Sequence, residues 1–478
     1  MKRLAALLVA TLLALAAIEG GLRLWTVLPP APLFESAGDG RLVTSSAWPV
    51  IGRVELNESP KRLRIVWMGA STVQGVPFQP VVSPPRWLDL ILAWRGVRAE
   101  VIPVAGSGLD ATRLASFMPD VLALQPDAIV ITTGHNEYLR TGELLDKRWW
   151  HSLQLGWRLN MLIEGAARQV GRMPTIEHDF DHDAIIGNLR DRLAEMNALT
   201  AEAGVPLVMT VPVCNLADFP PALGDDPRIA PGPDAAWSLG QEALDLGNTR
   251  AALEAFEYAR DHDRWPHRAT ERVIATVKES ARVLVPIDRI IRDASESGSP
   301  GFDLFMDHCH PNLEGQRLLA LATADVLEDL RLFEATGLRG QAPPAAEVLP
   351  RFGVNPGVRK AAEARTGRAL VRFALLSGKN TSGRAGNIEL AARDMLLQVQ
   401  ASAEAPIAEI EANLLLLELK IGEVDAARGR LASARRDNPA SVQRLQYLHD
   451  TYPWVREVFE ENGFRLFDGE LLSLRRLP

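Results

Sequence analysis

One serine, one histidine and one aspartate have the residue types and settings that nucleophilic chemistry requires. Ser71 follows the apolar run 65–68 in "RIVWMGASTVQG", and Asp307 and His310 stand three residues apart in "DHCHP". A carboxylate three residues before a histidine, in a turn, can bond the ring Nδ1 and leave Nε2 as a base. A serine hydroxyl is unreactive at its own pKa and needs such a base within reach. Because a serine after a strand is also a common helix cap, both roles of Ser71 are open at this point.

A carbonyl attacked by this serine would need hydrogen-bond donors for the negative charge that develops on its oxygen. The candidates are the backbone N–H groups of Ser71 and Gly106, in "VAGSG", and the side-chain amide of Asn136, in "TTGHNEYL". Gly106 allows close backbone approach to a ligand. A glycine or asparagine after a strand is often only a turn residue, so each candidate alone is weak evidence for an oxyanion site. Their joint occurrence at strand ends, in this order, is the stronger indication.

The elements that must position these residues are five short apolar runs, rich in Val and Ile. They predict strands at 63–68, 99–104, 128–133, 205–211 and 283–287, and helical patterns separate them, as at 86–95, 110–124 and 184–203. This alternation predicts an α/β fold with a parallel sheet covered on both faces. Such sheets bind ligands at the carboxyl ends of their strands, where Ser71, Gly106 and Asn136 all fall.

The segments "MGASTVQG", "VAGSG", "TGHNEYL" and "DHCHP" resemble, in this order, the sequence blocks of the SGNH hydrolase (GDSL-type esterase) superfamily. The resemblance covers about 61–335, apart from an insertion. It implies a flavodoxin-like, three-layer α/β/α fold with a parallel five-stranded sheet, and no cofactor or metal. It also implies Ser71 as nucleophile, His310 as base, Asp307 as the partner of that base, and an oxyanion hole made by Ser71, Gly106 and Asn136.

Two positions depart from the family's pattern, and one neighbour competes for the role of base. Ala70 stands where the family has an aspartate outside the triad, so this change is tolerable. Glu137 replaces the aspartate after Asn136, which leaves the bonding inside that loop open. His308 is a rival base, but it directly follows Asp307, where the carboxylate cannot easily orient its ring.

The amino-terminal end has the pattern of a secretory signal or a signal anchor. Two basic residues precede the uncharged apolar run 4–18. We predict an uncleaved anchor over 1–25, with the basic end inside and the rest of the chain extracytoplasmic, on the periplasmic or cell-surface side. Cleavage after the Ala-Leu-Ala at 14–16 is the alternative. Residues 26–60 include Pro29, Pro30 and Pro32 and show little periodicity, which predicts a tether with an irregular lead-in.

Two segments, 239–263 and 413–439, have the spacing of a tetratricopeptide repeat, with small residues where two helices would cross. The first predicts a helical insertion at about 235–280, inside a hydrolase domain over 61–335. The second lies in a predicted helical region, 356–478, after a Pro/Ala-rich linker at 336–355. Two units fall short of a self-standing solenoid, and such helices suggest a surface for a protein partner.

Composition narrows the remaining functions. The 478-residue chain has a net charge of −8 and two cysteines, which argues against nucleic-acid binding and against a cysteine-based zinc module. Cys214 and Cys309 predict either a disulfide at the catalytic edge or two buried thiols. The Trp-rich segment 139–183 fits a helix packed on the sheet or one that touches lipid, and "HDFDHD" at 178–183 fits a solvated loop or a metal site.

The reading that these features favour is a serine esterase that hydrolyses an acyl ester through an acyl-enzyme on Ser71. Its substrate would be an acetyl group on an envelope glycan, or a lipid ester. An O-acyltransferase that passes the acyl group to an extracytoplasmic polysaccharide is the first alternative. An adaptor with helical repeats and a vestigial hydrolase domain is the second. The sequence does not distinguish the acyl group or the acceptor.

Overall fold

The computed structural model of the chain describes residues 32–59, 62–139, 180–222, 230–376, 387–401, 403, 407–451 and 453–463, together with Ala14, Leu15 and Ala17. Most of the predicted anchor and most of the Trp-rich segment therefore lie outside the described residues. Among the residues that are described, none of the helices combines the length and the apolar character that crossing a membrane requires.

The predicted parallel sheet is confirmed, with all five strands in place. They are β4 (Leu63–Gly69), β5 (Ala99–Ala105), β6 (Ala128–Thr132), β7 (Leu207–Thr210) and β8 (Val283–Val285). Their spatial order is β5-β4-β6-β7-β8, and every neighbouring pair is parallel. In chain order this is 2-1-3-4-5, the order of flavodoxin-like sheets. The central strand β6 is buried at each of its positions, which explains its uninterrupted apolar sequence.

Helices pack together in two groups beside this sheet. In one group, α3 (Pro84–Trp94) packs against α12 (Leu313–Asp329), which also contacts α11 (Ile287–Ala294). In the other, α7 (His182–Glu202) packs against both α4 (Ala111–Ala123) and α10 (Glu271–Ser280). The three helices predicted from periodicity are thus confirmed, with ends within two residues. Side chains that accept N-terminal backbone N–H groups define their starts: Ser83 for α3, Asp110 for α4 and Asp181 for α7.

A small antiparallel sheet occupies much of the predicted tether. It consists of β1 (Phe34–Gly38), β2 (Arg41–Thr44) and β3 (Glu55–Asn57), with the short 3-10 helix η1 (Pro49–Ile51) between the last two strands. Leu33, Ile51 and Leu56 are buried in the same core as the parallel sheet. The lead-in is therefore a packed part of the fold, and not only an irregular segment.

Two helix pairs form where the repeat-like spacing predicts them. Helices α8 (Pro233–Asp245) and α9 (Thr249–Asp261) pack together between β7 and β8 in the chain. A Cβ on Gly240 would lie 2.5 Å from the Phe256 ring, so a glycine is required where they cross. Helices α16 (Ala408–Lys420) and α17 (Val424–Asp437) form the second pair. Their assignment to a repeat family stays a prediction.

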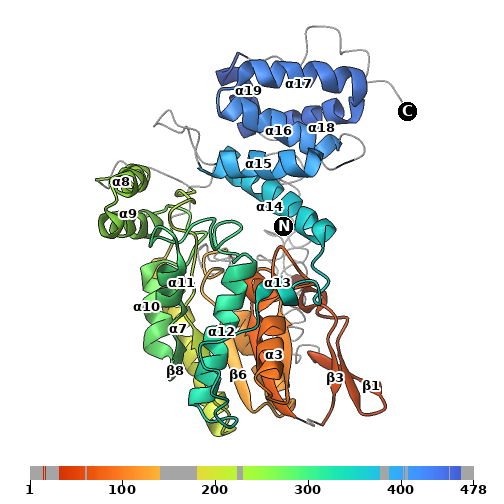
Figure 1. Ribbon diagram of the computed structural model, residues 1–478, viewed down its shortest axis with the longest axis vertical. Coiled ribbons are helices and arrows are strands. Elements are labelled where there is room, and N and C mark those ends of the chain that lie inside the picture. Colours follow the sequence, from red (N-terminus) through yellow and green to blue (C-terminus); the bar gives the residue numbers. More distant parts are fainter. Residues whose placement is uncertain are drawn as a thin grey trace, which may run out of the picture.

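The remaining helices build a second core. They are α14 (Pro356–Leu376), α15 (Asn387–Ala401), α18 (Pro439–Thr451) and α19 (Pro453–Glu461). Figure 1 shows α14 leading from the sheet part of the molecule to the group α15–α19. Their buried apolar side chains form one cluster with those of α16 and α17, and Phe219, from the loop after β7, also belongs to it.

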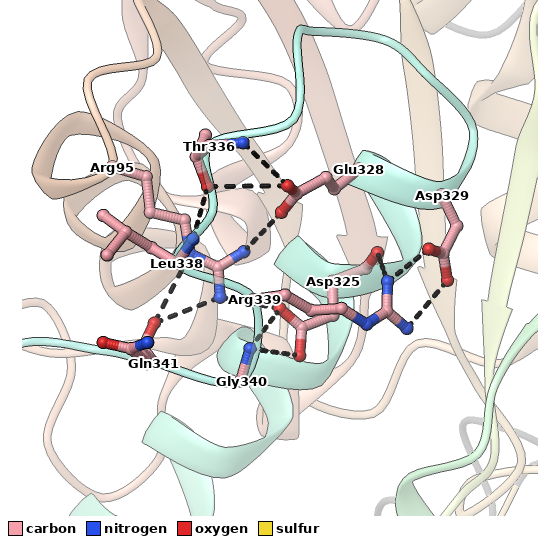
Figure 2. A network of polar contacts seen from close by, with 9 residues as sticks. All are labelled: Arg95, Asp325, Glu328, Asp329, Thr336, Leu338, Arg339, Gly340 and Gln341. Carbon is pink, nitrogen blue, oxygen red and sulfur yellow. Dashed lines mark hydrogen bonds and ion pairs between the residues drawn. The ribbon is translucent and has the colours of Figure 1, made fainter.

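Residues 336–355, the predicted linker, contact the sheet part at several points. Figure 2 shows Arg95, just after α3, between Asp325 and Glu328 of α12 and the backbone carbonyl of Gln341. The short helix α13 (Ala345–Val348) follows, and Val348 is buried in the core of the sheet part. The segment is therefore packed against this core, whereas the domain boundary itself stays a prediction.

Candidate active site

Ser71 lies at a tight turn between β4 and the short helix α2 (Ser71–Gln74). The turn requires glycine at 69, because a Cβ there would lie 2.3 Å from a Val73 methyl and 2.8 Å from the Thr132 carbonyl oxygen. Ala70 takes the N-cap position of α2, and no side chain caps this helix. The alternative role of Ser71 as the helix cap is therefore excluded, and its hydroxyl is directed elsewhere.

The hydroxyl of Ser71 belongs to a continuous chain of polar contacts with His310 and Asp307. Ser71 Oγ lies 2.8 Å from His310 Nε2. On the other side of the ring, His310 Nδ1 lies 2.8 Å and 2.7 Å from the two oxygens of Asp307. With the proton on Nδ1, the ring donates to the carboxylate and its Nε2 accepts from the serine hydroxyl, which is the arrangement of a serine–histidine–aspartate triad.

The turn that carries Asp307 and His310 is closed by its own backbone. The N–H groups of Cys309 and His310 donate to Asp307 Oδ1 at 3.1 and 2.9 Å, and Met306 N–H donates to the His310 carbonyl at 2.8 Å. Asn312 then caps α12 by accepting from two backbone N–H groups. Burial alone would raise the pKa of Asp307, but the imidazoles of His310 and His308 hold it well below its usual value. Asp307 is therefore ionised and orients the His310 ring.

His308, the rival base, faces a different environment. Its Nδ1 lies 3.4 Å from Asp307 Oδ1, and its ring packs between Phe219 and Phe373, with centroid distances of 5.5 and 5.1 Å. Burial lowers the pKa of His308, although Asp307 opposes the shift. Because His310 and not His308 contacts the Ser71 hydroxyl, the geometry favours His310 as the base.

The three strand ends that carry the predicted site residues are in register. Gly69 of β4 is paired with Ala105 of β5 and with Thr132 of β6. The loop after β6 contains Asn136, whose Nδ2 donates to the Leu109 carbonyl at 2.8 Å. This bond uses one of the two amide protons and holds the side chain against the loop after β5.

Gly106 is held in a way that the sequence does not reveal. Its N–H donates to the Gly69 carbonyl at 3.3 Å, which extends the contact between β4 and β5 by one residue. A Cβ at this position would lie 2.6 Å from the Val50 carbonyl oxygen, so the small lead-in sheet region requires a glycine here. The N–H of Gly106 thus already has an acceptor, and its role as an oxyanion donor stays a prediction.

Two buried titratable residues flank Asn136, and only Glu137 was singled out from the sequence. His135 Nδ1 accepts from the Ala269 N–H at 3.1 Å. Burial, together with His308 and His310, lowers the pKa of His135 to about 3, so this ring is neutral. Burial and the charge of Asp110 raise the pKa of Glu137 to about 7. The sequence "GHNEY" places the titratable Glu137 directly after the amide of Asn136, but it does not reveal which groups Glu137 contacts.

The other predicted candidates have structural roles. Cys214 and Cys309 are free thiols, buried in one apolar cluster, so the alternative without a disulfide holds. Within "HDFDHD", residues 180–183 are described: Asp181 caps α7, and His182 Nδ1 lies 3.0 Å from the Tyr138 hydroxyl. Within the described part of the chain, the grouping with metal-like spacing is 307–310, where Asp307 and His310 Nδ1 already bond each other.

Comparisons with known proteins give similarities to solved structures. No protein-family model matches the chain, and no curated protein matches it. A GDSL-like lipase from Bacteroides thetaiotaomicron is 15% identical, with a TM-score of 0.31, over 57% of this chain and 93% of that one. A lipase/acylhydrolase from Enterococcus faecalis is 13% identical, with a TM-score of 0.31, over 57% and 99%. An acetyl xylan esterase is 13% identical, with a TM-score of 0.31, over 54% of this chain and 97% of that one. At this level of similarity, a functional assignment has to come from the geometry of the site.

Proposed function

We propose that the chain is a serine hydrolase of the SGNH type, with the three-layer α/β/α arrangement of that superfamily, and that it cleaves an acyl ester through an acyl-enzyme on Ser71. The observation that carries this proposal is the unbroken contact chain from Ser71 Oγ through His310 to Asp307, with distances of 2.7–2.8 Å. The position of the serine directly after β4, the first strand of the parallel sheet in chain order, in a sheet of order 2-1-3-4-5, supports the same proposal.

The reaction follows from these contacts. Ser71 Oγ attacks the ester carbonyl carbon while His310 Nε2 takes the hydroxyl proton. Ionised Asp307 keeps the ring in the tautomer that accepts this proton, and stabilises the imidazolium that results. The C–O bond to the alcohol then breaks, and His310 returns the proton to the leaving oxygen. In the second half, His310 activates a water that cleaves the acyl-enzyme, which releases the acid and restores Ser71.

The developing oxyanion would be held by the N–H of Ser71 and the amide of Asn136. Ser71 begins a helix, where backbone N–H groups lack the acceptor that a preceding turn would provide. Asn136 keeps a second amide proton after its bond to Leu109. Gly106 would join them only by releasing the Gly69 carbonyl. Loss of one such donor typically costs ~3 kcal/mol of barrier stabilisation.

Substrate class and cellular setting extend this proposal from the sequence. The acyl group would come from an O-acetylated envelope glycan or a lipid ester. The apolar run 4–18 would anchor the chain in a membrane, with the catalytic part on the extracytoplasmic side. The helix pairs α8–α9 and α16–α17 would offer a surface to a protein partner.

Hydrolysis of short-chain aryl esters by the full-length chain in detergent tests the proposal. We expect turnover by the wild type, none by Ser71→Ala, and wild-type turnover by Ser116→Ala, which changes an exposed serine on α4. If adding an acetylated or free glycan accelerates acyl release, the second half-reaction is transfer to a sugar hydroxyl and not hydrolysis. If the wild type shows no turnover with any ester, an adaptor with a vestigial site replaces the enzyme.

A further inference from the structure

Glu137 is a buried carboxyl group next to the proposed oxyanion donor Asn136, and the catalytic steps above do not use it. Its side chain is 7% exposed. Its Oε1 accepts two hydrogen bonds, from the Thr133 hydroxyl at 3.0 Å and from the Ala111 backbone N–H at 3.2 Å. Thr133 lies in the same loop after β6, whereas Ala111 begins α4 after β5. Glu137 Oε1 therefore links the loop after β6 to the start of α4.

Asn136 and Glu137 contact the two ends of one short segment. Asn136 Nδ2 donates to the carbonyl of Leu109, and Glu137 Oε1 accepts from the N–H of Ala111. Leu109 N–H in turn donates to the Gly106 carbonyl at 3.4 Å. Two successive side chains thus fasten the loop after β6 to the loop after β5. Both loops carry candidate oxyanion donors.

We propose that Glu137 is a positioning residue of the oxyanion hole, which holds Asn136 against the loop after β5 by accepting the Ala111 N–H and the Thr133 hydroxyl. This inference rests on the proposed function, because it takes Asn136 as a donor to the oxyanion. Asn136 has no second anchor of its own among the described side chains, so its amide depends on the backbone that Glu137 fixes. A displacement of about 1 Å at such a donor can lower a rate a hundredfold.

The setting explains why the acceptor is a long carboxyl side chain. Ala111 is the first residue of α4, and its N–H has no acceptor within the helix. Asp110, the N-cap, uses its own carboxylate to accept from Arg113 N–H at 2.8 Å. The Ala111 N–H is thus left for an acceptor from another element, and Glu137 reaches it across the gap between the two loops.

The charged and titratable neighbours of Glu137 come from both packed elements. Asp110, at the start of α4, raises the pKa of Glu137 and adds to the effect of burial, while the bonds from Thr133 and Ala111 lower it. Tyr138, the next residue of its own loop, is a neutral phenol whose pKa is itself raised by burial. The proposed role needs an acceptor oxygen and not a negative charge. Glu137→Gln keeps such an oxygen, whereas Glu137→Ala removes it, so the two variants should differ in activity.

Kinetics of Glu137 variants in the full-length chain test the inference. We expect Glu137→Ala to lower kcat for an aryl ester by about tenfold to a hundredfold with little change in KM, because a displaced donor weakens the transition state and not substrate binding. Glu137→Gln keeps an acceptor oxygen of the same reach, so we expect kcat within about threefold of the wild type, with no transition near pH 7 attributable to this residue. Glu202→Ala, at an exposed glutamate of α7, is the matched control.

Three results would overturn the inference: wild-type kcat in Glu137→Ala, an equal loss in Glu137→Gln and Glu137→Ala, or a loss that appears only in KM. If Glu137→Ala does not fold, Thr133→Val decides instead, since it removes one donor to Glu137 and keeps the side-chain shape. We then expect a fall in kcat of several fold, and an unchanged kcat contradicts the role. An inactive wild type would refute the proposed function itself, whereas an active wild type with an unaffected Glu137→Ala would refute only the inference.

Discussion

At the scale of single residues, the site depends on a few backbone constraints that make ordinary side chains reactive. Gly69 lets β4 turn into α2 without a clash, and this turn places the Ser71 hydroxyl beside His310. His310 is suited to its proposed role as a base because Asp307, held by two N–H groups of its own turn, fixes one side of the ring. One constraint positions Ser71 and the other orients His310, so separate substitutions can test them.

The orientation of His310 by Asp307 leads to a first prediction. Asp307→Asn keeps the shape of the side chain, but its amide favours the wrong tautomer of His310. We expect kcat to fall by about 10³-fold or more, with the chain still folded. Steady-state kinetics on an aryl ester measure this, and Asp191→Asn, at an exposed aspartate of α7, serves as a control. A kcat within tenfold of the wild type would mean that Asp307 does not orient the base.

The burial of Glu137 predicts how stability depends on pH. Its pKa of about 7 in the folded chain lies above the usual value of 4.5, so folding favours the protonated form. The stability that it contributes is full below about pH 4.5 and is lost as the pH rises through 7. The shift corresponds to about 3 kcal/mol as an order of magnitude. Glu137→Gln should therefore gain roughly this much over the wild type between pH 5 and pH 8, as measured by urea unfolding.

Asp307 affects the pH dependence of stability in the opposite direction to Glu137, and in a lower pH range. Its lowered pKa contributes stability that is present above its usual pKa and is lost as the pH falls further. Burial also lowers the pKa values of His135 and His308, which makes stability rise with pH over part of this range. The difference between the wild-type and Glu137→Gln profiles therefore isolates Glu137. Parallel pH profiles for the wild type and Glu137→Gln would show that Glu137 is ionised at neutral pH like an exposed glutamate.

At the scale of elements, the strands were the most predictable part of the molecule. Buried parallel strands are apolar on both faces. A short apolar run such as 128–132 can therefore be recognised as a strand from its own sequence, without knowledge of the neighbouring strands. The strands β1 and β2 were missed because none of their residues is buried and they have no such run. The bond from Gly106 N–H to Gly69 and the packing of Val50 on Gly106 join distant segments, and nothing local in the sequence encodes them.

The junction of α3 and α12 gives a prediction of stability at this scale. Arg95 is fully buried, and its guanidinium reaches Asp325 at 2.6 Å and Glu328 at 3.2 Å (Figure 2). Arg95→Ala leaves these two carboxylates without their shared cation, so we expect a loss of about 3–5 kcal/mol. Arg339→Ala, which removes an exposed ion pair with Asp329, should cost about 0–1 kcal/mol. Equal losses in urea unfolding would contradict the importance of burial.

At the scale of the whole molecule, the helical region contacts the catalytic turn. Phe373 of α14 packs against His308 at 5.1 Å and against Phe219 at 5.1 Å. The His308 ring, in turn, lies edge-on to His310 at 5.4 Å. The sequence did not indicate this contact, because Phe373 belongs to a helix that was assigned to a separate region. The carboxyl-terminal helices thus support the turn that holds the base.

Removal of this contact should affect activity as well as stability. We expect Phe373→Ala to lower kcat by about threefold to tenfold, because a cavity beside His308 lets the turn that carries Asp307 and His310 shift. Phe333→Ala, at a half-buried residue beyond the far end of α12, is the matched control for loss of aromatic packing. An unchanged kcat in Phe373→Ala would make the contact between the two regions purely structural.

The site at which an active-serine probe reacts tests the proposed role of Ser71 most directly. The full-length chain is treated with a fluorophosphonate, digested and analysed by mass spectrometry. We predict an adduct on the peptide that contains Ser71, formed much more slowly in His310→Ala. No adduct, an adduct on another serine, or a rate that does not depend on His310 would contradict this prediction.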